Sequence, residues 1–371
     1  MVTQQLEFTS DELLTTHDVA EPLVANGVAC HGGFADDGTY ISPRTLHRGP
    51  AIEAWEAHRL EQFGTEKLDA PVEQWPEPFP NVEQTKLLLR HGVRDQVIST
   101  LTRVGTVEGF GSMLRYLPLP DLHGTFEEDI TGTATEHIPL GLFEAHARDE
   151  AGFEDVAGHD RMWFAARDIA FENPVTADQT AYMLERMGIS GPGGAPPDLA
   201  AMRKAALAAR VLPDAVPFEL ESMLARMIGL LFIEISAFHT FRWAEAVLSD
   251  PELTAGDGEA ARIVSYIRAD ETPHVGYLEV ALSEMRDRTW IGADGTRFDG
   301  AEMMPIVWDK ALEQSMVARR SDLLQLTMRE IDAALDVASI TASARDDLLD
   351  EMFAQGAVER LPDGSLMDRA A

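Results

Sequence analysis

The sequence predicts an all-α protein in which four long helices form a bundle. After residue 80, apolar side chains recur every three or four positions over long stretches, which is the spacing of one buried helix face. No stretch of useful length alternates between apolar and polar residues, so we expect little β-sheet. The four long predicted helices cover residues 82–117, 136–171, 217–249 and 258–288.

Three parts of the chain are expected. Residues 1–80 are rich in Gly, Pro and His and end in a proline cluster at 71–80, so we predict an irregular extension packed on the bundle, with one short helix near 51–63. Residues 81–290 form the bundle, and residues 291–371 form a C-terminal helical extension. The smaller predicted segments are a Gly/Pro linker at 188–197, a short helix at 197–211, and helices at 301–337 and 342–355.

Composition limits the partners of this acidic protein. Its 371 residues are 45% hydrophobic, which suits a globular core, and a net charge of −33 argues against nucleic acid because phosphates are repelled. The N-terminus has no basic and apolar signal segment, and the apolar run at 228–235 is too short to cross a bilayer. The single cysteine, Cys30, fits a reducing compartment. We therefore expect a cytoplasmic homodimer with a small-molecule substrate and no membrane association.

The predicted helix 258–288 carries two metal-ligand residue types on its apolar face. Glu271 and His274 lie about one turn apart within the apolar stripe, so both side chains are able to reach a common ion. Burying a carboxylate without a cation is costly, which favours a ligand role. Pro273 allows two interpretations: it begins a new helix, or it kinks a continuous one. The unbroken phase of the stripe favours the continuous helix.

Each of the other long helices also has one glutamate on its apolar face. These residues are Glu108, Glu150 and Glu234. A single such glutamate is commonly half-exposed or capped, whereas one in each of four helices predicts a dinuclear metal site bridged by carboxylates.

Two short segments resemble a known superfamily. ARDEAG at 147–152 and RADETPH at 268–274 are similar to the paired Glu-x-x-His helices of ferritin-like di-iron carboxylate proteins. The resemblance covers about residues 82–288 and implies a ferritin-like four-helix bundle, two iron ions and an O2-dependent oxygenase or oxidase. The residues that match the order of the superfamily's ligands are Glu108, Glu150, Glu234, Glu271 and His274.

The second helix departs from the superfamily, which has a histidine where this chain has Phe153. His159 follows an imperfect six-residue repeat, but on a regular helix it points away from Glu150, so its use as a ligand requires a bulge or a break. His146 lies four residues before Glu150 and needs no distortion, although a surface charge network also explains it. A third alternative is that no histidine is supplied here and that the site is asymmetric or mononuclear.

Glutamates with imidazoles favour iron, with manganese as a competitor, over zinc or copper. We therefore expect two Fe ions, with Mn possible, and O2 as co-substrate in an oxygenase or oxidase that acts on a small organic molecule.

Other functions stay open at this point. One is a ferritin-like protein for metal storage or peroxide handling. Another is a haem-oxygenase-like di-iron oxidase, in which Glu136 with His146, or Glu127 with His137, supplies ligands. The last is a metal-free helical protein in which the core acids pair with Arg90, Arg103, Arg226, Arg242 or Arg268.

Overall fold

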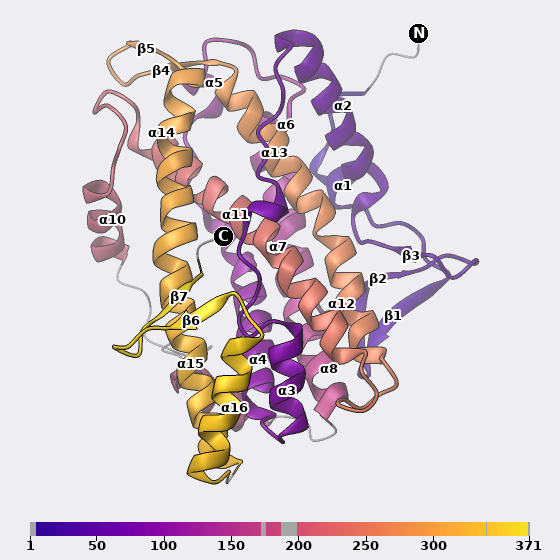
Figure 1. Ribbon diagram of the computed structural model, residues 1–371. Helices are drawn as coiled ribbons and strands as arrows, with labels where there is room; N and C mark the ends of the chain where they lie inside the picture. Colours follow the sequence, from indigo (N-terminus) through magenta and orange to yellow (C-terminus); the bar gives the residue numbers. More distant parts are fainter. Residues whose placement is uncertain (1–4, 172–175, 187–198, 339, 370–371) are drawn as a thin grey trace.

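The structure is a computed structural model, and it describes residues 5–171, 176–186, 199–338 and 340–369. The described chain is mainly helical, as predicted, with three small antiparallel sheets. The longest helix, α11, lies in the middle of the molecule, with α14 and α15 on one side and α12 and α13 on the other (Figure 1). The helices closest to the candidate site are α4 (Asp95–Gly109), α7 (Phe143–Ala151), α8 (His159–Phe171), α11 (Phe218–Leu248), α12 (Glu259–Asp270) and α13 (Thr272–Arg286).

Helix α11 agrees with the predicted helix 217–249. By length and composition alone it is apolar enough to cross a membrane, which was not expected from the sequence. Nearly half of its most apolar window is buried inside the protein, and it packs against α12, α13 and α14. A core helix passes the same length and composition test, so this feature is weak support for a membrane span.

The prediction of one continuous helix over 82–117 was wrong. The segment forms α3 (Val82–Arg90), α4 and a 3-10 helix, η2 (Phe110–Tyr116). Helix α3 ends at Arg90, and Gly92, two residues later, takes a φ of 78°, a left-handed conformation that glycine adopts without strain. The break leaves α4 free to pack along α8 and α15.

The predicted helix 136–171 is also divided. It contains α6 (Ala134–His137), a π-helical turn η3 (Ile138–Leu142), α7 and α8. Between α7 and α8, residues 152–158 form a non-helical turn, in which Gly152 has a φ of 75° and Glu154 a φ of 53°. This turn is the break that a ligand role for His159 required.

The predicted helix 258–288 follows one path through α12 and α13. Glu271 separates the two helices but keeps right-handed helical dihedral angles, with φ −75° and ψ −20°. The Glu271 amide donates to Ile267 O, and the Val275 amide donates to Glu271 O, so hydrogen bonds continue across the junction. The continuous interpretation of Pro273 is confirmed.

The N-terminal part is more regular than predicted. A hairpin of β1 (Glu21–Ala25) and β2 (Val28–Phe34) extends to β3 (Tyr40–Ile41). Asn26 and Gly27 link the first two strands with φ values of 46° and 79°, the conformation that Asn-Gly turns favour. The remaining elements are α1 (Ser10–Leu14), α2 (Thr45–Phe63) and η1 (Val72–Gln74). Helix α2 begins six residues before the predicted 51–63 helix, continues through Pro50 and packs on α13.

The C-terminal part is helical, as predicted, with two added hairpins. Its elements are β4 (Thr289–Ile291), β5 (Arg297–Asp299), α14 (Gly300–Glu313), the π-helical η4 (Gln314–Arg319), α15 (Arg320–Val337), α16 (Ala342–Ala354), β6 (Val358–Arg360) and β7 (Leu366–Asp368). The short helices elsewhere are α5 (Leu122–Thr125), α9 (Ala177–Arg186) and α10 (Leu199–Ala208). The predicted linker 188–197 lies outside the described residues.

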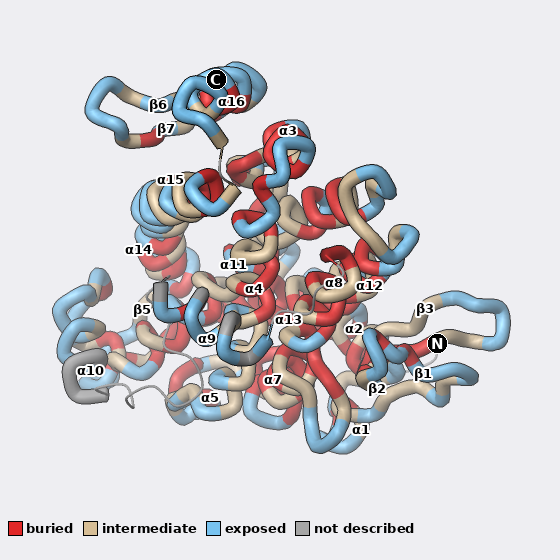
Figure 2. Tube along the Cα trace, turned by 90° about the horizontal axis from the view of Figure 1, so that it is seen from below, coloured by how far each residue is buried: buried red, intermediate tan, exposed pale blue. Residues whose placement is uncertain are grey.

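Burial is greatest along the central helices. Figure 2 shows buried segments of α4, α8, α11 and α13 in the interior, whereas α16, β6 and β7 are largely exposed at one edge. One hydrophobic cluster joins α2, α11, α13 and α14, and a second joins α4, α8, α11 and α12. The candidate site lies among helices that belong to both clusters.

Candidate metal centre

Seven buried or half-buried side chains from five segments of the chain form what we call the glutamate–histidine cluster. Their ligand atoms form two groups, in each of which the atoms lie within 4.8 Å of one another. The first group is His146, Glu150, Glu234 and His274, and the second is Glu108, Glu150, His159 and Glu271. The two groups share Glu150, so they describe two neighbouring positions for a cation.

Two carboxylates lie between these positions. Glu150 Oε1 is 3.5 Å from His146 Nε2, 3.2 Å from His274 Nδ1 and 3.4 Å from His159 Nδ1. Glu271 presents one oxygen to each side, with Oε1 3.0 Å from His159 Nδ1 and Oε2 2.6 Å from His274 Nδ1. A carboxylate that faces both groups in this way is suited to bridge two ions.

The turn at 152–158 places His159 in the cluster. A Cβ on Gly158 would lie 2.3 Å from the Gly152 amide nitrogen and 2.6 Å from Glu150 O, so only glycine fits there. This close approach reverses the chain after α7 and begins α8 at His159, beside Glu150 rather than on the opposite face of one long helix.

Several cluster atoms have no hydrogen-bond partner in the described part of the chain. They are His146 Nε2, His159 Nδ1, Glu150 Oε1 and Glu271 Oε1. Buried polar atoms without a partner are uncommon and call for an explanation. The four carboxylates of the cluster would carry four negative charges, which two divalent cations would balance. The buried glutamates and histidines are thus positioned to bind a metal ion.

His274 is oriented from outside the cluster by Asp149. His274 Nε2 lies 2.9 Å from Asp149 Oδ2, which leaves Nδ1 facing Glu150 and Glu271. Asp149 in turn accepts hydrogen bonds from Arg44 Nε at 2.8 Å and Arg48 Nη2 at 2.7 Å. Carboxylates of this kind fix the tautomer and orientation of metal-binding histidines.

The other two histidines have similar supports. His159 Nε2 lies 3.4 Å from Asp270 Oδ2, and the Tyr40 hydroxyl donates to the same oxygen at 2.9 Å. His146 Nδ1 lies 3.0 Å from the Tyr277 hydroxyl. Each imidazole therefore directs one nitrogen to the cluster and the other to a supporting oxygen.

The pKa values in the cluster are set by burial and by the close approach of several carboxylates and imidazoles. Burial and the neighbouring carboxylates raise the pKa values of Glu150 and Glu271 well above the usual range. Burial alone would lower the pKa of His159, but Glu271 and Glu150 raise it well above its usual value. Burial and the neighbouring His146 lower the pKa of His274 to about 3, so this ring is neutral, the form that binds metals.

Outside the cluster, Asp149 behaves differently from the buried glutamates. Burial alone would raise its pKa, but Arg44 and Arg48, together with His274, hold the pKa well below its usual range. Asp149 is therefore ionised and suited to accept a proton-bearing nitrogen of His274.

The structure brings together all six residues named first from the sequence. Both histidine alternatives of the second helix, His159 and His146, are present in the cluster. The surface explanation of His146 was wrong because this ring is fully buried.

Two other residues considered from the sequence lie outside the cluster. The Glu136 Oε2 atom accepts a hydrogen bond from the Gly132 amide, and its Oε1 is 3.4 Å from His123 Nε2. Phe153 is half-exposed beneath the guanidinium of Arg148.

Two rival arrangements lack support in the described residues. Arg103 pairs with Glu330 and Arg268 with Glu245, and no arginine pairs with a glutamate of the cluster among the residues described. The Glu127 carboxylate binds Arg297, while His137 contacts backbone atoms of Phe8 and Thr133. Neither the Arg-paired core nor the Glu127–His137 site is therefore formed.

The residues that support the histidines were not predicted from the sequence. They are Tyr40, Arg44, Arg48, Asp149, Asp270 and Tyr277. Asp149 and Asp270 each precede a cluster glutamate directly, and this repeated Asp-Glu pair was a usable signal. Nothing local marks Arg44 and Arg48, because they lie about 100 residues before Asp149.

Comparisons of the chain with protein-family models, curated proteins and solved structures find no match.

Proposed function

We propose that this protein is a non-haem di-iron, or iron–manganese, oxidoreductase that uses O2 to oxidise a small organic substrate. The observation that carries this proposal is the sharing of Glu150 between two groups of carboxylate and imidazole ligands, with Glu271 also facing both. The resemblance of residues 82–288 to ferritin-like di-iron carboxylate proteins supports it and suggests that the helices around the cluster have that bundle arrangement.

The ligand types favour iron or manganese. Four carboxylates and three imidazoles are a mixture of hard oxygen and borderline nitrogen donors. A structural zinc site is usually closed by four ligands and gains little from an excess of carboxylates. When bound, a pair of such ions supplies the electrons and the open positions for O2 chemistry.

The residues of this chain supply the setting for that chemistry. Glu150 and Glu271 face both groups of ligands and would bridge two ions. Glu234 adds a carboxylate that is ionised, since the neighbouring imidazoles lower its pKa to about 2 against the effect of burial. Asp149 holds the neutral His274 ring in place. Burial of the cluster excludes bulk water, which suits the control of reactive oxygen species.

Metal analysis of protein expressed with iron tests the proposal. We expect close to two Fe ions per chain, and we expect Glu234→Ala to lose most of this metal because it removes a ligand from the first group. The matched control is Glu245→Ala on the same helix, where the carboxylate pairs with Arg268 and lies outside the cluster. Folded, iron-supplied protein without bound metal would refute the proposal.

The same samples separate the alternative functions. Consumption of O2 by the reduced protein, with about two ions per chain, supports an oxidoreductase. Uptake of many more ions per chain would instead indicate metal storage. A stable protein that binds no metal would indicate a metal-free helical protein.

A further inference from the structure

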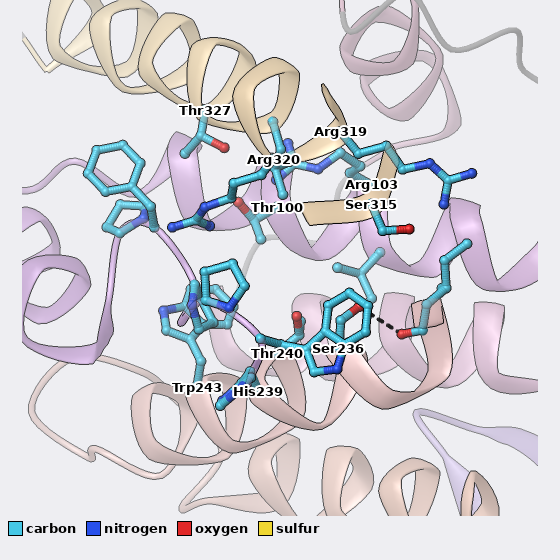
Figure 3. Close-up of a pocket in the computed structure, with 18 of the residues that line it drawn as sticks. Thr100, Arg103, Ser236, His239, Thr240, Trp243, Ser315, Arg319, Arg320 and Thr327 are labelled. Atoms are coloured by element: carbon cyan, nitrogen blue, oxygen red, sulfur yellow. Dashed lines mark hydrogen bonds between the residues drawn. The ribbon is translucent and has the colours of Figure 1, made fainter. Parts of the chain in front are cut away.

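A pocket of about 280 Å³ lies between α4, α11, the segment 75–80 and the junction of η4 with α15. Figure 3 shows three labelled arginines on one side of this pocket, across from the polar side chains that α11 contributes. The residues come from parts of the chain that are more than 200 positions apart, so the pocket is a product of the tertiary structure.

The charge of the pocket is opposite to that of the protein. Arg103, Arg319 and Arg320 line it, and no Asp or Glu is among its described lining residues, although the chain has a net charge of −33. Arg103 pairs with Glu330 and Arg320 with Asp368, but no ion pair of Arg319 occurs among the described residues. A local cluster of cations in an acidic protein favours an anionic ligand.

Three lining residues carry buried polar atoms without a partner among the described residues. These atoms are Gln96 Oε1, Thr327 Oγ1 and Trp75 Nε1. Gln96 and Thr327 are each only 1% exposed, so water does not reach them freely. Buried donors and acceptors are normally satisfied, and a bound molecule with polar atoms would satisfy these.

Another part of the wall is apolar and aromatic. Trp75, Phe232 and Trp243 line the pocket together with prolines of the segment 75–80. Aromatic rings of this kind bind planar apolar groups by stacking and edge contacts. The volume lies near the lower end for organic ligands, which suits a body of one or two rings.

Two lining residues of the pocket lie on helices that also carry cluster glutamates. Val104 lines the pocket one helical turn before Glu108, and Ile233 lines it directly before Glu234. Part of its rim, including Ser315, comes from the π-helical turn η4, and such turns are frequent at functional sites.

We propose that this pocket binds a small organic anion with a planar apolar body, of the class of aromatic carboxylates, as the substrate of the metal centre. The binding of the anion stands on the pocket alone, whereas its role as substrate rests on the proposed function.

Calorimetric titration of the full chain, after removal of metal with a chelator, tests the binding. The probe is 2-naphthoate, with 2-naphthamide as a neutral molecule of the same shape and acetate as an anion without the ring body. We expect naphthoate to bind at least about tenfold more tightly than naphthamide, and acetate to show no binding at the same concentrations. Equal affinity for naphthoate and naphthamide would overturn the assignment of an anion site.

Two variants locate the binding. Arg319→Gln is expected to weaken naphthoate roughly tenfold and to leave naphthamide unchanged, since it removes a charge that has no ion pair within the described chain. Thr327→Val keeps the shape of the side chain and removes the unpartnered hydroxyl, so it should weaken naphthoate without lowering the unfolding temperature. The control is Arg329→Gln, an exposed arginine of α15 outside the pocket. Naphthoate affinity that is equal in all three variants and the original protein would refute binding at this pocket.

A spectroscopic titration tests the substrate role separately. Protein loaded with Co(II) is titrated with 2-naphthoate, and we expect its visible ligand-field spectrum to change with the same dissociation constant as in calorimetry. An unchanged spectrum at saturation would overturn the substrate role but not the anion site. If the protein binds naphthoate but no metal, the proposed function fails while the anion site stands.

Discussion

His146, His159 and His274 each face the glutamates with one ring nitrogen and a supporting oxygen with the other. The supports differ: a tyrosine hydroxyl for His146, and the carboxylates Asp270 and Asp149 for the others. Since the supporting group determines which nitrogen bears the proton, each ring is prepared to offer a lone pair to a cation.

Removal of one support should weaken metal binding without disturbing the fold. Tyr277→Phe deletes the hydroxyl that lies 3.0 Å from His146 Nδ1 and keeps the ring that packs in the core. We expect metal affinity to fall by roughly 10-fold or more. Competition with a chromophoric chelator measures this affinity. Tyr116→Phe is the control, because that side chain is 69% exposed on η2, and equal affinities in the two variants would contradict the role of Tyr277.

At the scale of elements, the turn at 152–158 and the junction at Glu271 decide where ligands lie. The turn ends α7 just after Glu150 and begins α8 at His159, so two helices deliver residues that one straight helix would keep apart. The junction keeps the helix path, although Pro273 has no amide hydrogen to donate to the preceding turn. Both features bring buried polar groups together at helix ends.

The turn at 152–158 requires glycine at position 158. Gly158→Ala places a methyl group against the Gly152 amide and Glu150 O, both of which are backbone atoms, so the turn must shift. We expect a lower free energy of unfolding and a loss of bound metal, measured by urea denaturation and metal analysis.

The matched control for this substitution is Gly229→Ala on α11, where an added Cβ meets nothing within 4 Å. That variant should be as stable as the original protein or more stable by up to about 1 kcal/mol, because alanine favours helices. If Gly158→Ala behaves like Gly229→Ala, the turn does not depend on close packing at Gly158.

The end of α13 is joined to α2 through Asp287. Burial alone would raise the pKa of Asp287, but hydrogen bonds from Arg286, Thr65 and Arg59 outweigh it and lower the pKa. A carboxyl whose pKa is lower in the folded state stabilises the protein above its unfolded pKa and loses this contribution as the pH falls through the folded pKa.

We therefore expect Asp287→Asn to reduce stability at neutral pH and to approach the original protein in acid. Urea denaturation at a series of pH values from about 7 to about 3 measures the difference, since the ordinary pKa of an aspartate is about 3.9. A difference that is independent of pH would show that the charge of Asp287 is not the cause.

At the scale of the whole molecule, the N-terminal part belongs to the candidate centre. Helix α2 supplies Arg48, which bonds to Asp149, and β3 supplies Tyr40, which bonds to Asp270. Residues that precede the predicted bundle therefore hold the two aspartates that support His274 and His159. The predicted boundaries at 80 and 290 remain predictions, as do the homodimer and the cytoplasmic location.

The net charge of −33 has a consequence for the entire fold. Like charges at this density repel one another in the compact state, and salt reduces the repulsion. We expect the unfolding temperature to rise when potassium chloride is increased to about 0.15 M, where the Debye length is about 8 Å. Differential scanning calorimetry provides the measurement, and an unfolding temperature that falls with salt would show that attractive ion pairs dominate instead.

Much of the candidate site was predictable because helical phase survives from sequence to structure. Glu108, Glu150, Glu234, Glu271 and His274 lie on apolar faces, and apolar faces of neighbouring helices meet. The Asn26-Gly27 hairpin was also predictable from its turn residues but was not predicted. The break at Gly92 was missed because apolar periodicity continues through it. The break at 152–158 was considered only as a condition for a ligand role of His159.

By itself, the sequence determined the helical class, the large negative charge and the four glutamates of the cluster, since these follow from residue types and from their spacing along each helix. Only the tertiary structure decided that His146 and His159 both join the cluster and that Arg44 and Arg48 hold Asp149. The physical reason is that these contacts depend on how the chain turns between helices, and such turns are determined by close packing between residues that are far apart in the sequence.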